Sequence, residues 1–183
     1  MEPQPQKENF LKEIVKFTLI ALVIVVPIRL WIAQPFIVSG ASMDPTFKSG
    51  QYLIVDQLTY HFNEPERGDV IIFRYPRDPK TFFIKRIIGL PGETVTFKDG
   101  KPTMTGPNLK EPVTLDETYI AANHKTADNF AITLRDNEYF VMGDNRAESS
   151  DSRYWGPLER KYIVGRPAVR LFPFTKIGVF PGK

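Results

Sequence analysis

Two segments of this chain hold residues that together could activate a nucleophile. In residues 39–46, SGASMDPT, Ser42 lies among small and turn-forming residues, so a substrate can approach its hydroxyl closely. In residues 82–92, FFIKRIIGLPG, side-chain alternation along a strand would place either Lys85 or Arg86 on or beside an apolar face. Burial lowers the pKa of a lysine, and a neutral amine is a usable general base. Taken separately, the two segments also fit a simple turn and a lysine at a sheet edge.

A third segment, 143–156, is rich in short polar side chains and follows a predicted strand directly. Its sequence is GDNRAESSDSRYWG. Asp151 and Arg153 can form an ion pair, and the hydroxyl of Ser149 or Ser152 can orient a neighbouring amine. A purely structural hydrogen-bond network is the alternative interpretation of this loop.

Other catalytic classes lack the residues they need. The chain has no cysteine, which excludes disulfides, thiolate zinc sites and a cysteine nucleophile. It has only two histidines, His61 and His124, and neither lies in a nucleophile motif, so neither a Ser-His-Asp triad nor a histidine-rich metal site is expected. The G-x-S-x-G, H-E-x-x-H, P-loop and G-x-G-x-x-G patterns are absent. A serine–lysine pair, a known form of activated nucleophile, remains.

Strands are expected to position these residues. The 183 residues suggest one domain, and 42% hydrophobic with 25% charged residues allow a packed core. Sixteen prolines, twelve glycines and fourteen phenylalanines favour turns between short aromatic-rich strands. The net charge of +3 is spread over both signs, which argues against a nucleic-acid groove. The predicted strands are 52–55, 70–73, 82–88, 94–97 and 139–142, and Asp99-Gly100 predicts a hairpin. We expect a mainly β body of antiparallel sheets with a small inserted region at 101–136.

The N-terminal part is expected to be one transmembrane helix over residues 11–33. Residues 17–28 carry no charge, and a second apolar run follows Arg29. A buried core helix and a cleaved signal peptide are the alternatives, but Arg29 and Trp31 do not suit the end of a signal peptide. Residues 1–10 then form a short tail, and the modest excess of lysines before the span favours an inward N-terminus.

Taken together and in order, these segments resemble the bacterial type I signal peptidases, membrane-bound Ser/Lys endopeptidases that cut signal peptides from exported preproteins. Each motif alone is weak, but all of them in this order after an N-terminal apolar segment are specific. The matching motifs are Ser42-Met43-x-Pro45-Thr46, Arg67-Gly68-Asp69-Val70, Lys85-Arg86-x-x-Gly89-x-Pro91-Gly92 and Gly143-Asp144-Asn145-Arg146-x-x-Ser149-x-Asp151-Ser152-Arg153.

The resemblance implies that Ser42 is the nucleophile and that Lys85 is the general base that takes its proton. The backbone N–H of Ser42 would form part of the oxyanion hole. Many members of the family carry a second hydroxyl two residues before the nucleophile, and Gly40 stands there in this chain. Ser149 would orient the amine of Lys85, and the residues that would hold its loop are Asp151 and Arg153.

Shallow substrate pockets are also implied, which would select small side chains, mainly Ala, at the first and third residues before the cut. The residues that would line them are Phe36, Val38, Met43, Phe83 and Ile84. No cofactor and no metal are expected.

The resemblance implies a single-pass protein of the bacterial plasma (inner) membrane with its N-terminus in the cytoplasm. The catalytic domain, 34–183, would lie outside, near the export translocon, where it would act on secretory preproteins and contact membrane lipid but no nucleic acid. We expect Trp155 and Phe36 to dip into the membrane interface. Two alternatives stay open: a processing peptidase with one dedicated substrate, and a non-catalytic module that binds exported chains.

Overall fold

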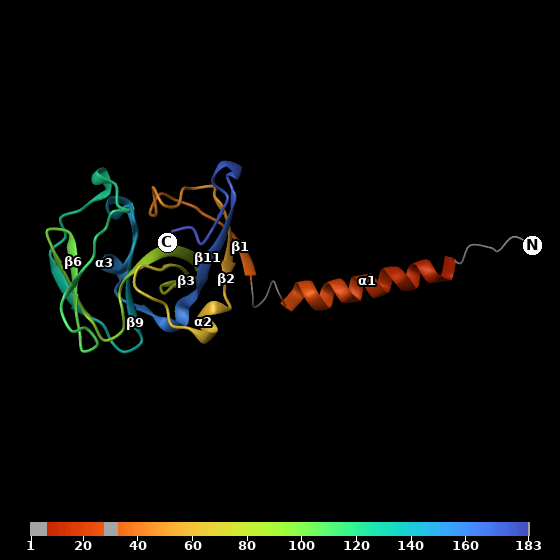
Figure 1. Cartoon of the computed structure of the whole chain (residues 1–183), viewed down its shortest axis with the longest axis horizontal. Helices are drawn as coiled ribbons and strands as arrows, with labels where there is room; N and C mark the ends of the chain where they lie inside the picture. The colour runs from red at the N-terminus through yellow and green to blue at the C-terminus, as the bar shows by residue number, and fades with distance from the viewer. Residues whose placement is uncertain (1–6, 28–32, 183) are drawn as a thin grey trace, which may run out of the picture.

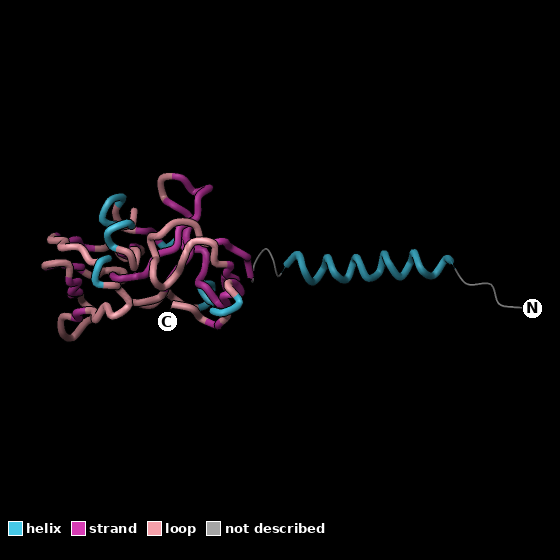
Figure 2. Tube along the Cα trace, turned by 90° about the horizontal axis from the view of Figure 1, so that it is seen from above, coloured by secondary structure: helices cyan, strands magenta, loops and turns pink. Residues whose placement is uncertain are grey.

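The computed structural model describes residues 7–27 and 33–182. Two antiparallel sheets build the body, and helix α1 (Lys7–Pro27) extends away from it (Figure 1). The view from above shows the same separation of helix and body (Figure 2). The prediction of a mainly β fold built from antiparallel sheets is therefore confirmed.

The larger sheet has eight strands in the order β1-β2-β11-β3-β4-β9-β10, with β12 paired to β11. The predicted strands that begin at residues 52, 70, 82 and 139 all lie in it. Its strands are β1 (Ala33–Ile37), β2 (Tyr52–Asp56), β3 (Val70–Tyr75), β4 (Asp78–Gly89), β9 (Glu138–Met142), β10 (Leu158–Glu159), β11 (Ile163–Phe172) and β12 (Gly178–Val179).

The smaller sheet has four strands in the order β7-β6-β5-β8. Its strands are β5 (Thr94–Lys98), β6 (Lys101–Thr105), β7 (Val113–Thr114) and β8 (Phe130–Thr133). The predicted hairpin joins β5 to β6. Asp99 (φ +50°) and Gly100 (φ +76°) both take the left-handed backbone conformation that a two-residue hairpin turn requires. Residues 101–136, weakly patterned in the sequence, thus supply three strands of this sheet.

Short helices occupy the connections of the body. They are α2 (Thr59–Phe62), α3 (Ser152–Trp155) and the 3₁₀ turns η2 (Ala122–His124), η3 (Arg146–Glu148), η4 (Arg160–Tyr162) and η5 (Phe174–Lys176).

Strand β4 is buried on both faces where it crosses the body. Ile87 belongs to one core cluster, with Phe73 and Val141, whereas its neighbour Ile88 belongs to another that includes Phe140. Because alternate side chains share a face, Lys85 lies on the face of Ile87 and Arg86 on the face of Ile88. Both cations are buried, with only 3% and 5% of their surface exposed. Each therefore needs polar partners inside the protein.

The expected transmembrane helix over 11–33 is not supported by the residues that the structure describes. Within 7–27 and 33–182, no helix is long and apolar enough to cross a membrane. Charged residues recur in α1 as far as Lys16, and the uncharged remainder of the helix ends at Pro27. Residues 28–32 of the expected anchor lie outside the described residues.

Candidate active site

Ser42 and Lys85 lie side by side. Ser42 stands in the turn that joins β1 to β2, and Lys85 lies in β4 opposite Ile71 of β3. The Nζ of Lys85 donates a hydrogen bond of 2.7 Å to the Oγ of Ser42 and a second, of 2.9 Å, to the carbonyl oxygen of Ile84. A general base must lie within hydrogen-bond reach of the proton it takes, and this pair meets that requirement.

Burial alters the acid–base properties of Lys85. Loss of solvent around the ammonium group lowers the pKa of Lys85 from 10.5 to about 8, although the negative charges of Asp151 and Asp144 act in the opposite direction. The ring of Phe83 lies 5.2 Å from Nζ and contributes to this apolar surrounding. At pH 8 about half of the Lys85 side chains are therefore neutral amines, which can accept a proton from Ser42.

A cavity of about 300 Å³ opens beside the pair. Four of the predicted pocket residues line it, namely Phe36, Val38, Phe83 and Ile84. The fifth, Met43, does not: it is 1% exposed and packs in a core cluster with Phe47. Residues that the sequence did not suggest also line the cavity, and they are Ile37, Ser39, Ala41, Leu53, Ile72, Phe82, Glu148 and Ser150.

The loop after β9 is held by a buried ion pair. Arg153 donates from Nε and Nη2 to the two carboxylate oxygens of Asp151, each at 2.9 Å, and from Nη2 to the carbonyl oxygen of Arg146 at 2.7 Å. Asp151 is fully buried and also accepts a hydrogen bond from the N–H of Gly143. The structure thus brings together Asp151 and Arg153, the two residues predicted to hold this loop, and the charge of Asp151 acts on Lys85.

A second buried ion pair was not assigned a role from the sequence. Arg86 donates from Nε and Nη2 to the carboxylate of Asp144 at 2.9 and 2.7 Å. Asp144 also accepts a hydrogen bond of 2.6 Å from the hydroxyl of Thr46, four residues after Ser42. Asp144 therefore links β4, the turn that carries Ser42 and the loop after β9. The sequence did contain a signal for this ion pair. Lys85 and Arg86 are adjacent on a strand with apolar faces, and a charge on a buried strand face requires a partner.

Comparison with known proteins identifies the family of this chain. The model of the family described as "Signal peptidase, peptidase S26" matches residues 11–172. The chain belongs to this signal peptidase family. The protein is accordingly a serine endopeptidase, and the prediction of a signal peptidase is confirmed.

Two relatives by sequence agree with this assignment. The chain is 35% identical to the "Probable signal peptidase I-1" of Synechocystis sp. over 96% of its length and 90% of the relative. It is 36% identical to the "Signal peptidase I" of Bacillus licheniformis over 96% of both chains. A crystal structure of a signal peptidase I from Enterococcus faecalis V583 is 33% identical, with a TM-score of 0.48, and covers 57% of this chain and 97% of that one.

Two glycines shape the signal peptidase site. Gly40 lines the cavity with φ +91°, a conformation that a side chain at this position would strain. Gly143 allows a close approach of two chain segments, because a Cβ there would lie 2.3 Å from both the carbonyl oxygen of Ser42 and the Oγ of Ser149. Asn145, two residues later, donates its N–H to that same carbonyl of Ser42 at 3.0 Å.

Among the described residues, neither candidate serine of the loop forms a side-chain hydrogen bond with Lys85. The Oγ of Ser149 is buried and has no hydrogen-bond partner among the described residues. The Oγ of Ser152 accepts a hydrogen bond from the N–H of Val141. Ser149 therefore retains an unused hydroxyl beside the site, whereas Ser152 is occupied in closing α3 onto β9.

Trp155 does not form part of the exposed apolar surface. Its ring packs against a core cluster and lies 5.8 Å from the ring of Phe73. Phe36 is half-buried at the cavity, with its ring 5.1 Å from that of Phe82. Both rings are half-buried, and the expectation that they dip into a membrane interface stays a prediction.

Proposed function

We propose that this protein is a signal peptidase I that removes N-terminal signal peptides from exported preproteins, with Ser42 as the nucleophile and Lys85 as the general base. The observation that carries the proposal is the 2.7 Å hydrogen bond between the buried amine of Lys85 and the Oγ of Ser42. Burial holds the pKa of Lys85 at about 8, which makes the neutral amine available near physiological pH.

The reaction follows from this geometry. Neutral Lys85 takes the hydroxyl proton as Ser42 attacks the scissile carbonyl carbon, and the resulting ammonium then protonates the departing amine. Water, deprotonated in turn by Lys85, hydrolyses the acyl-enzyme and frees Ser42. The N–H of Ser42 donates to no other described residue, so it is available to the oxyanion that forms on the carbonyl. Ser149, whose Oγ has no hydrogen-bond partner among the residues that the structure describes, is suited to hold the amine as the proton moves.

The cavity favours an extended substrate with small side chains. Within the described part of the chain, β1 pairs with β2 alone and β4 pairs with β9 only from Arg86 onward. Both strands therefore carry unpaired backbone where they border the cavity. A peptide can add there as a further strand. The packed rings of Phe36 and Phe82 limit the space in the cavity for the side chains of the substrate. This supports cleavage after Ala-x-Ala sequences.

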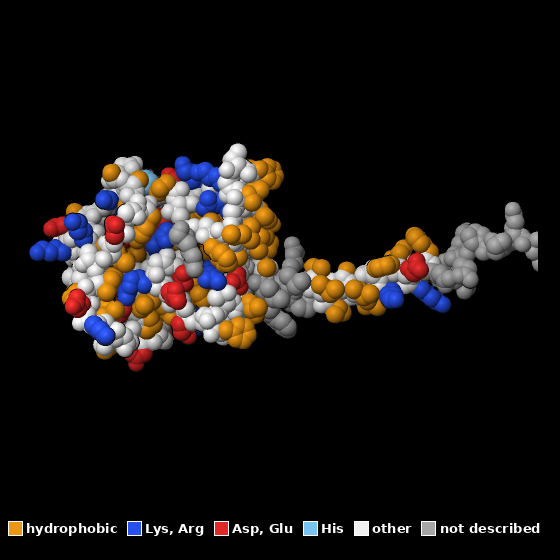
Figure 3. All heavy atoms as spheres, viewed as in Figure 1, with side chains coloured by type: hydrophobic (Ala, Val, Ile, Leu, Met, Phe, Trp, Pro, Cys, Tyr) orange, Lys and Arg blue, Asp and Glu red, His pale blue; other side chains and the backbone are white. Residues whose placement is uncertain are grey.

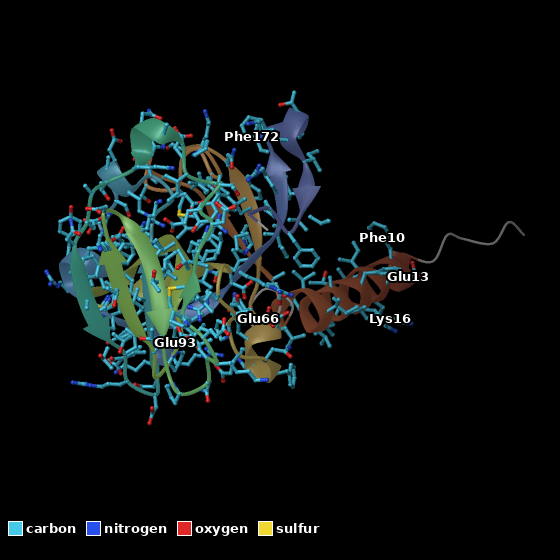
Figure 4. All side chains as sticks on the ribbon, turned by 60° about the vertical axis from the view of Figure 1, so that its left-hand side comes forward. Phe10, Glu13, Lys16, Glu66, Glu93 and Phe172 are labelled. Atoms are coloured by element: carbon cyan, nitrogen blue, oxygen red, sulfur yellow. The ribbon has the colours of Figure 1, made fainter. Side chains whose placement is uncertain are left out.

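We further propose that residues 11–33 anchor the protein in the bacterial plasma membrane, with residues 1–10 inside and 34–183 outside, close to the export translocon. The side chains of 10–26, among them Phe10 (Figure 4), are all exposed in the structure, and most of them are apolar. Hydrophobic side chains also gather on the side of the body nearest α1 (Figure 3). Exposed apolar residues of β1 and of the chain from β11 to β12 are Ile37, Leu171, Phe172, Phe174, Ile177 and Val179.

The test of the reaction is cleavage of a preprotein with an Ala-x-Ala site by the detergent-solubilised full chain. Wild type should cut once, after the second Ala, and Ser42→Ala should not cut. Cleavage by Ser42→Ala at the wild-type rate would overturn the assignment of the nucleophile. No cleavage by wild type of any of several preproteins would favour a binding module instead.

The test of the membrane setting is flotation with vesicles of phosphatidylethanolamine and phosphatidylglycerol. The full chain should float, and protease added outside the vesicles should digest the body of the inserted protein but spare the anchor. The variant Phe174→Ser/Ile177→Ser should reduce contact of the body with lipid, whereas Tyr154→Ser, an equally exposed aromatic residue on α3, should not. Recovery of the full chain only in the lipid-free fraction would contradict the proposal.

A further inference from the structure

We infer that residues 117–128, between β7 and β8, act as a brace that positions the catalytic loop and the nucleophile turn. The inference rests on the proposed function and assigns the smaller sheet a role in it. The brace, defined as residues 117–128, contacts four separate parts of the site through side chains or ring faces.

The first contact holds the start of the catalytic loop. The guanidinium of Arg146, 3% exposed, donates from both Nη atoms to the two carboxylate oxygens of Glu117. Its Nε donates at 3.0 Å to the carbonyl oxygen of Gly143. Gly143 is the residue that packs directly on Ser42 and Ser149. Glu117 thus acts through one arginine on the backbone beside the nucleophile.

The second contact holds the end of the same loop. Nη1 of Arg153 donates to the carboxylate of Asp128 at 3.0 Å and to the hydroxyl of Thr126 at 3.2 Å. The remaining donors of Arg153 are used by Asp151 and by the carbonyl of Arg146. Asp128 therefore completes the partners of the arginine that holds Asp151, the buried charge beside Lys85.

The third and fourth contacts reach the other side of the site. The ring of Tyr119 lies 4.0 Å from the guanidinium carbon of Arg86, the neighbour of Lys85 on β4. The Nδ1 of His124 donates to the carbonyl oxygen of Asp44, two residues after the nucleophile, at 3.0 Å. The brace therefore spans the nucleophile turn, the strand of the base and both ends of the catalytic loop.

The brace is itself tied to the smaller sheet. The N–H of Gly100, in the β5–β6 hairpin, donates to the carbonyl oxygen of Asp128 at 3.0 Å. The hydroxyl of Tyr119 donates to Glu117 at 3.0 Å, which fixes the carboxylate that binds Arg146. A small misplacement of catalytic groups can cost about a hundredfold in rate, so a rigid support of this kind affects catalysis without touching the substrate.

If the brace positions the catalytic loop, removing a brace contact should change the pKa of Lys85 in a defined direction. Lys85 is surrounded by apolar groups and faces the carboxylates of Asp144 and Asp151. Loosening the loop 143–153 would admit water around the amine, and the pKa of Lys85 would rise toward that of an exposed lysine. A loss of stability alone would leave the pH profile of the folded fraction where it is.

The experiment compares Glu117→Gln and Asp128→Asn with Asp116→Asn in the full-length solubilised enzyme. Asp116 is exposed, lies next to Glu117 and forms no ion pair among the described residues, so its variant makes the same charge change without a brace contact. We expect kcat to fall about ten- to hundredfold in the first two variants, with KM changed less than about twofold. The acidic limb of the pH profile should move to higher pH.

Amide hydrogen exchange in the Ser42→Ala background gives a readout independent of activity. Exchange of residues 143–153 should become faster in Glu117→Gln, while the strands of the larger sheet keep their protection. The inference is overturned if Glu117→Gln behaves like Asp116→Asn in kcat, pH profile and exchange. It is also overturned if protection falls throughout the body with an unchanged pH profile. If wild type cuts no preprotein, the proposed function fails, and the exchange data alone decide whether the brace positions the loop.

Discussion

The Oγ of Ser42 lies 2.7 Å from the Nζ of Lys85, although 43 positions separate the two residues in the chain. The turn that carries Ser42 is closed by two backbone hydrogen bonds of Val38, whose N–H donates to the carbonyl of Gln51 and whose carbonyl accepts from the N–H of Gly50. Lys85 reaches the hydroxyl from a strand buried on both faces. The pair therefore meets because the turn after β1 and strand β4 pack together.

Replacement of either member of the pair should abolish cleavage. Lys85→Met keeps the length of the side chain but removes the amine, and Ser42→Ala removes the nucleophile, so each should lower kcat by more than about a thousandfold. Single-turnover cleavage of an Ala-x-Ala preprotein measures this. Lys80→Met, on the exposed part of the same strand, is the control and should keep full activity. Retention of activity by Lys85→Met would exclude Lys85 as the base.

Activity should increase with pH through a single ionisation with an apparent pKa of about 8, because only neutral Lys85 can accept the proton of Ser42. Measurements of kcat/KM between pH 6 and pH 10, roughly the range that brackets this pKa, test the expectation. A profile that is already flat above about pH 6 would point to another base.

The same lowered pKa makes stability depend on pH. Between about pH 8 and pH 10.5 the unfolded chain holds a proton on Lys85 that the folded protein has lost. The free energy of unfolding should therefore rise with pH across this window, by about 3 kcal/mol relative to Lys85→Met. Urea unfolding of both proteins at several pH values measures the difference. An equal pH dependence in the two proteins would show that Lys85 is not buried as described.

Gly143→Ala should impair cleavage strongly. Its new Cβ would lie 2.3 Å from the carbonyl oxygen of Ser42, a backbone atom that cannot move without displacing the nucleophile. We expect a loss of kcat of about a hundredfold or more. Gly178→Ala is the matched control, since a Cβ at that position meets nothing within 4 Å. Equal activity of the two variants would contradict the close packing of the catalytic loop on the nucleophile turn.

Asp144→Asn should destabilise the protein by about 3–5 kcal/mol, because it leaves the buried guanidinium of Arg86 without its counter-charge. The double variant Arg86→Met/Asp144→Leu should recover part of that stability, since it leaves no unpaired charge. The activity of the double variant should remain low, because the hydroxyl of Thr46 loses its hydrogen-bond acceptor. The nucleophile turn then loses its link to the loop after β9. Additive losses in the double variant, measured by urea unfolding, would show that the two residues do not act as a pair.

Phe82→Ala should broaden the choice of substrate. The variant removes one of the two packed rings at the cavity and leaves the Ser42–Lys85 pair in place. Preproteins with Val or Leu in place of one Ala of the Ala-x-Ala site should then be cut more efficiently than by wild type, by about tenfold. Competition between such preproteins and the Ala-x-Ala form measures the ratio. An unchanged ratio would show that Phe82 does not limit the pocket.

The sequence by itself determined the class of fold and predicted the chemistry. Without cysteine and with two isolated histidines, the chain left a serine–lysine pair as its means of activating a nucleophile. Short β-branched and aromatic runs between turn residues predicted the strands β2, β3, β4, β5 and β9, because alternation and turn chemistry are local properties. The hairpin at Asp99-Gly100 followed from the same kind of local signal.

Only the tertiary structure decided what surrounds the pair. Met43 lies in the core and not at the cavity, because the turn after β1 directs its side chain inward, which no local pattern reveals. The contacts of Glu117 with Arg146 and of Asp128 with Arg153 join residues 29 and 25 positions apart, and charge pairing at that separation depends on how the sheets pack. The lowered pKa of Lys85 likewise arises from burial, which is a property of the folded body and not of the residues 82–92 alone.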